Sequence, residues 1–268
     1  ATVPFSAWID LLGWRVAFFT ADCLLCCCGL LLYFVLIKKP QRISFNEPEV
    51  VIDHGQRERT VAILRRIFSN RQAWALFCCH FGVVGGYVGF ISSWAVPYGM
   101  NMYEMTRSEA SQLIMIGLIG ALIGAPLLGW ISSWLGMIKK PYIIVQITVL
   151  IGWFTFLLCK GKPTLYLLIL LFFIIGIGYG ASALTFAAVR KSFPLKDSGI
   201  VSGFANTGGF LSAVLLPIIF GLILDYFQST SGNLLDGYYY SFITPVLFSL
   251  IGLLGIMIYK EKHQELAK

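Results

Sequence analysis

Charged residues are scarce in this sequence: Asp, Glu, Lys and Arg make up 12% of its 268 residues, whereas apolar residues make up 57%. Soluble domains average about 25% charged residues, so the composition excludes a water-soluble globule. The chain also lacks an initiator methionine, and we expect it to be a fragment or a processed form. The net charge of +7 does not indicate nucleic-acid binding, because the basic residues are confined to particular loops between apolar runs.

Long apolar runs fill most of the chain. A hydrocarbon core about 30 Å thick needs about 20 helical residues, so each run of that length predicts a transmembrane helix. The runs are 16–37, 74–98, 113–134, 142–158, 165–189, 200–224 and 240–259. The sequence therefore predicts an all-α integral membrane protein with seven full spans, preceded at residues 1–12 by the last turns of a further span.

Basic residues concentrate in alternate loops, above all in 38–73 and after residue 259. By the positive-inside rule we expect these segments to be cytoplasmic and the protein to lie in a plasma membrane, of the bacterial inner-membrane type. Residues 57–71 place apolar side chains on one helical face and arginines off it. This pattern predicts a basic amphipathic helix, which either lies on the membrane surface or covers the underside of the bundle.

The last six spans divide into two sets of three, 74–158 and 165–259, whose middle helices share a pattern. In each, a proline precedes a glycine, and polar or aromatic residues follow at the membrane edge. The residues are Pro126, Gly129 and Ser133 in the first set and Pro217, Gly221 and Asp225 in the second. The charge distribution puts these edges on opposite faces, and such inverted repeats are typical of secondary transporters.

Several glycine-containing motifs extend along the chain. They are Gly13-Trp14-Arg15 before Phe18 and Phe19, the series Gly117, Gly120, Gly124, Pro126 and Gly129, and the segments 184–190, 202–210 and 221–225. These resemble the sixth, eighth, tenth and eleventh helices of the major facilitator superfamily of solute transporters. The resemblance covers nearly the whole chain and implies a twelve-helix protein working by alternating access. It implies that 1–37 ends an N-terminal bundle, 38–73 is the central loop, 74–259 is the C-terminal bundle, and 260–268 is a cytoplasmic tail. The rest of the N-terminal bundle would come from the same protein or from a partner.

Two departures from the family pattern bear on function. The loop after the eighth helix usually carries an acidic and a basic residue where this chain has Ser133 and Trp134, although Gly129, Gly136, Lys139 and Lys140 remain. Control of gating by a salt bridge there is therefore not expected, and the candidates for the gating-loop motif are Gly129, Ser133, Gly136, Lys139, Lys140, Gly221 and Asp225. The antiporter motif of the fifth helix would fall near Pro4, but its glycines are absent. We therefore expect uptake, by proton symport or uniport, rather than drug efflux.

Inside the spans only Asp22 and His80 are ionisable among Asp, Glu, Lys, Arg and His. Such residues are costly in a membrane, so both are candidates for ion or proton coupling. For Asp22 the alternative is a carboxyl near the external surface, either hydrated or paired with Arg15, which lies seven residues earlier on the same helical face. For His80 the alternative is a hydrogen-bonded packing histidine.

By the resemblance, three helices would line the solute cavity with neutral polar and aromatic side chains. The candidates are Tyr87, Ser92, Ser93, Trp94, Tyr179, Ser182, Thr185, Asn206 and Thr207. Groups of this kind orient a small solute in a mostly apolar cavity, although any one of them also suits a helix-helix contact.

The sequence also bears on two other classes of membrane protein. Seven spans also match a seven-helix receptor or sensor, but no lysine lies at a membrane centre for a retinal Schiff base, and the longest loop follows the first span. An enzyme is not expected, because no span carries a nucleophile with its base or a set of metal ligands. The sequence therefore predicts a transporter of a small organic solute with no cofactor and no metal.

Overall fold

The computed structural model describes residues 8–9, 11–38 and 60–261. It divides into two units at Ile63–Leu64, and each is considered by itself. The first contains α2 (Trp14–Lys38), an apolar helix of 25 residues. Most of the predicted central loop, 39–59, and the tail after residue 261 lie outside the described residues.

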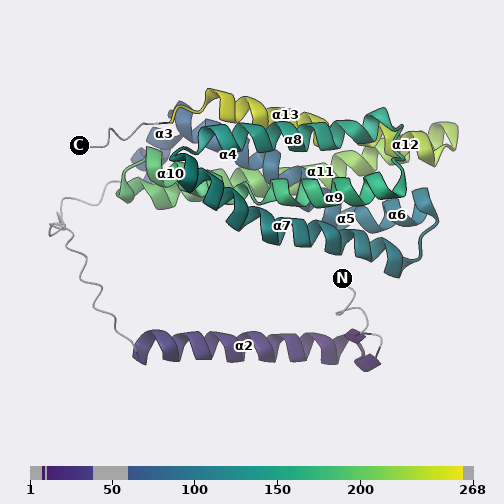
Figure 1. Cartoon of the computed structure of the whole chain (residues 1–268), viewed down its shortest axis with the longest axis horizontal. Helices are drawn as coiled ribbons and strands as arrows, with labels where there is room; N and C mark the ends of the chain where they lie inside the picture. The colour runs from purple at the N-terminus through teal and green to yellow at the C-terminus, as the bar shows by residue number, and fades with distance from the viewer. Residues whose placement is uncertain (1–7, 10, 39–59, 262–268) are drawn as a thin grey trace. The chain divides into compact units, whose positions relative to one another are not determined.

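The second unit is a bundle of six spans (Figure 1). Together with α2 it gives seven helices, within the part of the chain that the structure describes, that are long and apolar enough to cross a membrane, which is the number of full spans predicted from the sequence. The elements are α4 (Arg71–Val84), η1 (Gly85–Gly89), α5 (Phe90–Ser93) and α6 (Ala95–Tyr103) in the first span, then α7 (Arg107–Leu135), α8 (Lys139–Leu158), α9 (Leu165–Tyr179) with α10 (Ser182–Ser192), α11 (Leu195–Ser231), and α12 (Leu234–Ser241) with α13 (Ile243–Ile258).

Several helices begin earlier than the apolar runs predict, because polar caps lie outside those runs. Thr106 and Glu109 form the predicted capping box, so α7 begins at Arg107 rather than at 113. Asn233 accepts from the backbone amides of Leu235 and Asp236 and starts α12 before residue 240. Hydropathy therefore located the spans, whereas hydrogen bonding to backbone amides sets where they begin.

Proline accounts for two of the interruptions within spans, which the apolar runs did not predict. Pro97 has no N–H to donate to the carbonyl of Ser93, and the first span breaks at Trp94 between α5 and α6. Pro245 stands in the same relation to Ser241, and the last span breaks at Phe242. Both breaks follow from the lost fourth-residue hydrogen bond.

A third interruption, at Gly180–Ala181 between α9 and α10, has no proline. Here the chain makes tighter i→i−3 bonds: the Gly180 amide donates to Ile177 at 3.0 Å, and the Ala181 amide donates to Gly178 at 2.9 Å. Short stretches of this kind inside a helix often mark a hinge.

Glycines set the closest helix contacts in the bundle. Gly120 and Gly124 of α7 lie against the backbone of α9 at Phe173 and Ile177, and Gly176 of α9 lies against Gly117. In lipid, association depends on such close packing, because hydrocarbon tails provide no hydrophobic drive between helices. The absence of a Cβ at these glycines therefore lets the backbones of α7 and α9 approach closely.

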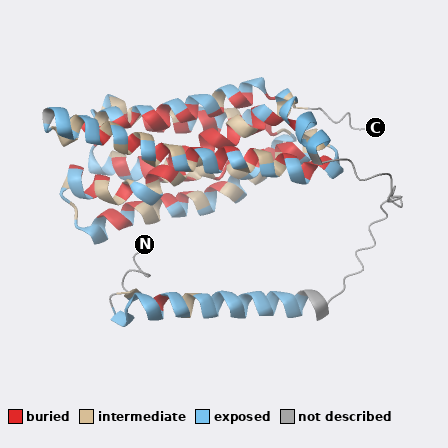
Figure 2. Cartoon of the chain, turned by 180° about the vertical axis from the view of Figure 1, so that it is seen from behind, coloured by how far each residue is buried: buried red, intermediate tan, exposed pale blue. Residues whose placement is uncertain are grey.

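On its other side, the bundle centres on α4, which packs between α11 and α13. Buried side chains line the inside of the bundle along its whole length (Figure 2). Toward α6 and α12 the core is aromatic: the ring of Phe90 contacts those of Trp153, Phe220 and Phe242 at 5.4–5.7 Å between centroids.

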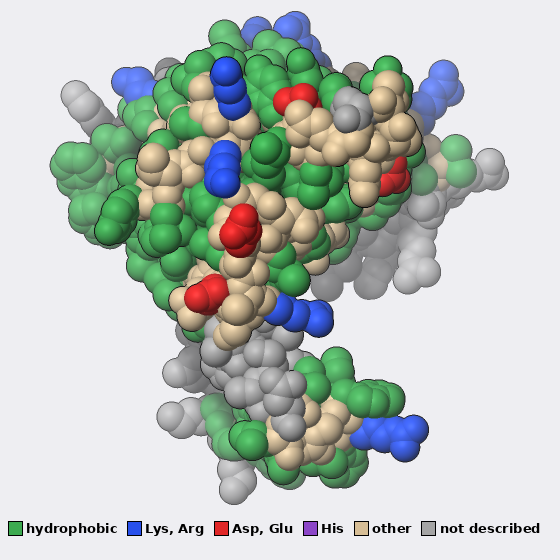
Figure 3. Space-filling model, turned by 90° about the vertical axis from the view of Figure 1, so that its right-hand side faces the viewer, with side chains coloured by type: hydrophobic (Ala, Val, Ile, Leu, Met, Phe, Trp, Pro, Cys, Tyr) green, Lys and Arg blue, Asp and Glu red, His purple; other side chains and the backbone are tan. Residues whose placement is uncertain are grey.

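The two ends of the bundle differ in charge. The end at which α8 and α11 begin and α10 and α13 finish carries Lys139, Lys140, Arg190, Lys191 and Lys196; we call it the basic end. The opposite end, at α6 and α12, presents acidic as well as basic side chains (Figure 3).

Helix α3 (Thr60–Phe68) meets the basic end through its last residues. The Arg66 guanidinium donates to the carboxylate of Asp197 at 2.7 Å, Ile67 is buried, and the Phe68 ring packs on Phe204. This is the contact expected of a helix that covers the underside of the bundle. A position on the membrane surface stays a prediction.

Candidate functional site

The first group of candidate residues lies on a π-helical turn, η1, in the middle of the first span. Tyr87 of this turn stacks on Tyr179, with ring centroids 4.7 Å apart and an interplanar angle of 24°. The Tyr87 hydroxyl is buried and has no hydrogen-bond partner within the described chain. Because π-turns occur frequently at functional sites and unpaired buried hydroxyls are costly, this group is a candidate for contact with a ligand.

The second group lies at the break between α5 and α6. Ser92 and Ser93 are exposed, with hydroxyl oxygens 3.4 Å apart. The Trp94 indole N–H donates to the carbonyl of Pro217 at 3.1 Å, and its ring lies against Gly221. Trp94 and Gly221 are thereby accounted for by helix packing, whereas the two serines face outward from the bundle.

The third group is a chain of buried polar side chains between α4, α8 and α10. His80 Nδ1 lies 3.3 Å from the hydroxyl of Thr185, which in turn lies 2.7 Å from that of Tyr142. The side chain of Asn206 is within hydrogen-bonding reach of the same imidazole. His80 is therefore a buried, hydrogen-bonded histidine, and its role in coupling stays a prediction.

Tyr179 and Ser182 flank the interruption between α9 and α10, and both are half-buried. Thr207 is exposed on α11 and donates to the carbonyl of Gly203 in its own helix at 3.0 Å. The structure thus brings Tyr87 to Tyr179 and His80 to Thr185 and Asn206. Ser92, Ser93 and Thr207 make no contact with either group in the described residues.

Asp22 belongs to α2 in the first unit and is exposed there. The Arg15 guanidinium lies over the ring of Trp14, 5.3 Å from its centroid. Arg15 and Asp22 form no ion pair within the described residues, so of the two alternatives for Asp22 the paired carboxyl is not found, and the hydrated carboxyl and the coupling role stay predictions. Seven residues span about 10.5 Å along a helix, and the neighbouring indole is nearer to the cation.

At the basic end, a carboxylate that the sequence did not single out ties three segments together. Glu261 accepts from the backbone amides of Ile138 and Lys139 at 2.8 and 2.9 Å and pairs with the Lys191 ammonium at 2.8 Å. Burial raises the pKa of this carboxyl, but the hydrogen bonds from Lys191 and from the two amides outweigh burial and hold the pKa below its usual range. The carboxylate is therefore held ionised at the start of α8.

The predicted gating residues fall into three places. Gly129, Ser133 and Gly136 line a pocket between α7 and α10, and Lys139 beside it donates to the carbonyl of Met257 at 3.0 Å. Lys140 is exposed on the first turn of α8. Gly221 and Asp225 lie elsewhere, toward the far end of α11.

Sequence reasoning missed further polar residues besides Glu261. Gln146 is fully buried in α8, where its amide donates to the carbonyl of Cys79 at 3.3 Å, and the Trp153 indole N–H is buried without a partner in the described residues. The signal for Gln146 was its position as an amide in an otherwise apolar span. No comparable signal marks Trp153, because tryptophan is common in membrane helices.

Comparison with known proteins gives consistent results over the whole chain. The sequence model of the Major Facilitator Superfamily matches residues 1–183 and 138–268. A probable nitrate/nitrite antiporter, NarK1 of Thermus thermophilus, is 26% identical over 254 residues, which cover 87% of this chain and 53% of the relative. A cis,cis-muconate transport protein of Acinetobacter baylyi is 25% identical over 265 residues, which cover 94% of this chain and 58% of the relative. The chain spans just over half the length of these relatives. It belongs to the Major Facilitator Superfamily.

Proposed function

We propose that the protein containing this chain carries a small solute across a membrane by alternating access, in the direction of uptake. The observation that carries the proposal is where polar side chains lie along the interrupted spans. Tyr87 lies on η1, Ser92 and Ser93 at the α5–α6 break, and Tyr179 and Ser182 at the α9–α10 break. In secondary transporters, discontinuous helices form the solute site near the membrane midplane. Family membership favours this function over the seven-helix receptor and over an enzyme.

The two relatives direct the choice of solutes to test. Nitrate and cis,cis-muconate, named in those relatives, are small anions. None of the proposed cavity residues is a lysine or arginine, so a solute held here is oriented by hydroxyl, amide and ring contacts. If the solute is anionic, its charge is balanced by groups of the N-terminal bundle.

Proton symport and uniport remain the two proposed modes. His80 and Asp22 are the proposed coupling groups for symport. His80 has the stronger structural support, since a network of Thr185, Tyr142 and Asn206 already surrounds it. A buried imidazole joined to hydroxyls has the means to pass a proton between them.

We propose that the protein lies in the plasma membrane and that its basic end faces the cytoplasm. The concentration of lysine and arginine at that end supports it. So does the course of two helices: α7 finishes at the basic end, whereas α11 begins there. Ser133 and Asp225 consequently occupy opposite ends, as inverted repeats 74–158 and 165–259 require.

Tyr87→Phe tests the solute site. Removing a buried hydroxyl that has no partner in the described chain costs no hydrogen bond, so the melting temperature should stay the same or rise. If the hydroxyl forms a hydrogen bond with the solute, KM for uptake should rise about tenfold, which corresponds to the loss of one well-formed hydrogen bond. The measurement is uptake of nitrate, nitrite and cis,cis-muconate into proteoliposomes, together with Tm in detergent.

The matched control is Tyr166→Phe, which removes a hydroxyl from an exposed tyrosine at the start of α9 and should leave KM unchanged. Asn206→Ala extends the test to α11 and should also lower uptake. Unchanged uptake in both Tyr87→Phe and Asn206→Ala, with protein levels equal, would show that these residues do not line the solute path.

A further inference from the structure

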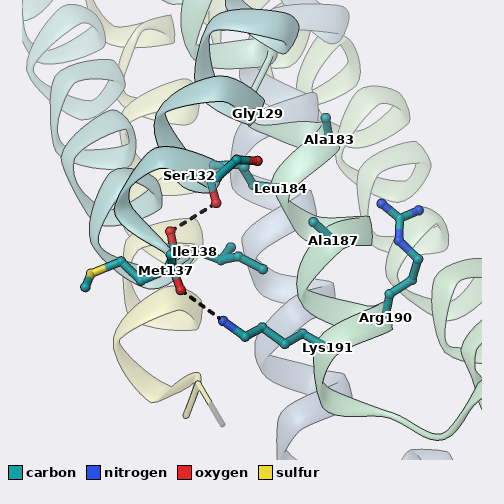
Figure 4. Close-up of a pocket in the computed structure, with 11 residues that line it drawn as sticks. Gly129, Ser132, Met137, Ile138, Ala183, Leu184, Ala187, Arg190 and Lys191 are labelled. Atoms are coloured by element: carbon teal, nitrogen blue, oxygen red, sulfur yellow. Dashed lines mark hydrogen bonds between the residues drawn. The ribbon is translucent and has the colours of Figure 1, made fainter. Parts of the chain in front are cut away.

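A pocket with a volume of about 430 Å³ opens at the basic end between the last turns of α7 and α10. In Figure 4, Ala183 and Ala187 of α10 lie opposite Gly129 and Ser132 of α7, and the side chain of Arg190, which also lines the pocket, extends away from Ser132. Small residues make up about half of the lining, and a Cβ added at Gly129 or Gly136 would meet nothing within 4 Å. The space is therefore large enough for a small polar head group, and no side chain fills it.

The charge of the pocket is carried by one side chain. Lys191 also lines it, but its ammonium is paired with Glu261 and lies 3.3 Å from the carbonyl of Gly136. Arg190 lines the pocket without an ion pair or hydrogen bond in the described residues, and so does the hydroxyl of Ser133. The guanidinium and the hydroxyl, which come from different helices of the pocket, are both donors, and a phosphate accepts from groups of both kinds.

Helix C-termini ordinarily repel an anion, because their last carbonyls point outward. Just beyond the end of α7, two carbonyls beside the pocket have donors from the chain: Ser132 Oγ donates to the carbonyl of Met137 at 3.0 Å, and Lys191 donates to that of Gly136. These donors reduce the repulsion that the two carbonyls would exert on an anion.

An apolar surface suited to lipid adjoins the pocket. Trp130 and Trp134, on the same turns of α7 as Gly129 and Ser133, are 65% and 75% exposed. Their rings stack with centroids 6.4 Å apart and planes within 11°. Exposed tryptophans at the end of a span lie at the head-group level of a bilayer. The phosphate-binding groups thus lie where lipid head groups do.

We propose that this pocket binds the phosphate of an anionic phospholipid, with Arg190 and Ser133 as its ligands and with acyl chains along Trp130 and Trp134. Basic pockets between transmembrane helices bind anionic head groups in this manner. None of the proposed solute residues lines the pocket, although Ser182 and Thr185 are next to the lining residues Ala183 and Leu184 on α10. The proposed site makes the function of the protein depend on membrane composition.

Native mass spectrometry of the protein purified in detergent tests this site. After exchange into phosphatidylglycerol or phosphatidylcholine, the wild type should retain phosphatidylglycerol preferentially. Arg190→Gln should lower that retention about fivefold, the effect of about 1 kcal/mol per basic residue near anionic lipid. Ala183→Leu, which fills the pocket and leaves the charge unchanged, should lower it as well.

Lys196→Gln is the matched control, because it removes one exposed positive charge from the same end outside the pocket and should leave retention unchanged. Tm in detergent establishes that each variant is folded. Three results would overturn the proposal: equal retention of the two lipids by the wild type, unchanged phosphatidylglycerol retention in both Arg190→Gln and Ala183→Leu, or displacement of phosphatidylglycerol by millimolar inorganic phosphate. The last would identify a site for soluble anions instead.

Discussion

Replacing Gly124 by alanine is expected to destabilise the bundle by about 3 kcal/mol, at the upper end of the cost of overpacking. A Cβ at this position would lie against the carbonyl oxygen of Ile177 and 2.8 Å from its Cα. Both are backbone atoms, so no side chain can change rotamer to make room. The α7 and α9 helices would have to separate. The other close contacts between the two helices, at Gly120, Gly176 and Gly180, would then be lost. The measurement is Tm in detergent, which should fall by about 10 °C.

The control lies on the same helix. Gly129→Ala introduces the same methyl group one and a half turns later, where nothing lies within 4 Å. Alanine has the higher helix propensity, so Tm should be unchanged or slightly higher. If Gly124→Ala and Gly129→Ala behaved alike, the backbone contact between α7 and α9 would be contradicted.

Replacing Glu261 by alanine should have the second largest effect, about 2 kcal/mol. It would leave Lys191 unpaired and the first amides of α8, at Ile138 and Lys139, without their acceptor. The Glu261 side chain is 7% exposed and that of Lys191 is 23% exposed, so screening by water reduces the loss below that of a fully buried pair. Tm should fall by about 5 °C at neutral pH.

The pH dependence of Tm distinguishes the contribution of the Glu261 charge from a non-specific loss of stability in the variant. The folded state lowers the pKa of Glu261, so its contribution to stability is fully present above the unfolded pKa of 4.5 and is lost as the pH falls through the lower folded pKa. Wild-type Tm should therefore approach that of Glu261→Ala below pH 4.5. Asp225→Asn, at an exposed carboxylate on the far end of α11, should leave Tm unchanged at neutral pH. A constant difference between wild type and Glu261→Ala down to pH 3 would mean that the carboxylate charge contributes nothing.

The number and order of the spans could be predicted because hydropathy is a property of single residues summed over a window. The start of α7 could also be predicted, since Thr106 and Glu109 are neighbours in sequence. Pro97 and Pro245 could have predicted the interruptions at Trp94 and Phe242. They were overlooked because each proline lies inside an apolar run that reads as one continuous span. The π-turn had only a weak signal: the three glycines of Gly-Gly-Tyr-Val-Gly lower helix propensity, but nothing in the sequence distinguishes a π-turn from a packed or bent α-helical turn.

The candidate site was less predictable for a physical reason. The pairing of Tyr87 with Tyr179 and of His80 with Thr185 joins residues about 90 and 105 positions apart, and such pairs depend on how helices rotate against one another. Glu261 was missed because it follows the last span, where a charged residue is expected in any case. Only the amides at the start of α8 make it distinctive.

The glycine contacts between α7 and α9 join these two helices into one rigid pair, which ends at the break between α9 and α10. Since the two backbones pack closely at Gly117, Gly120, Gly124 and Gly176, we expect α7 and α9 to move as one body. Beyond α9, rotation about the backbone of Gly180 and Ala181 would turn α10, and it would have to break the close contact of Gly180 with Gly124 and Ala125 of α7. The orientation of α10, and with it the positions of Thr185 and Arg190, then depends on the backbone torsion angles of Gly180 and Ala181.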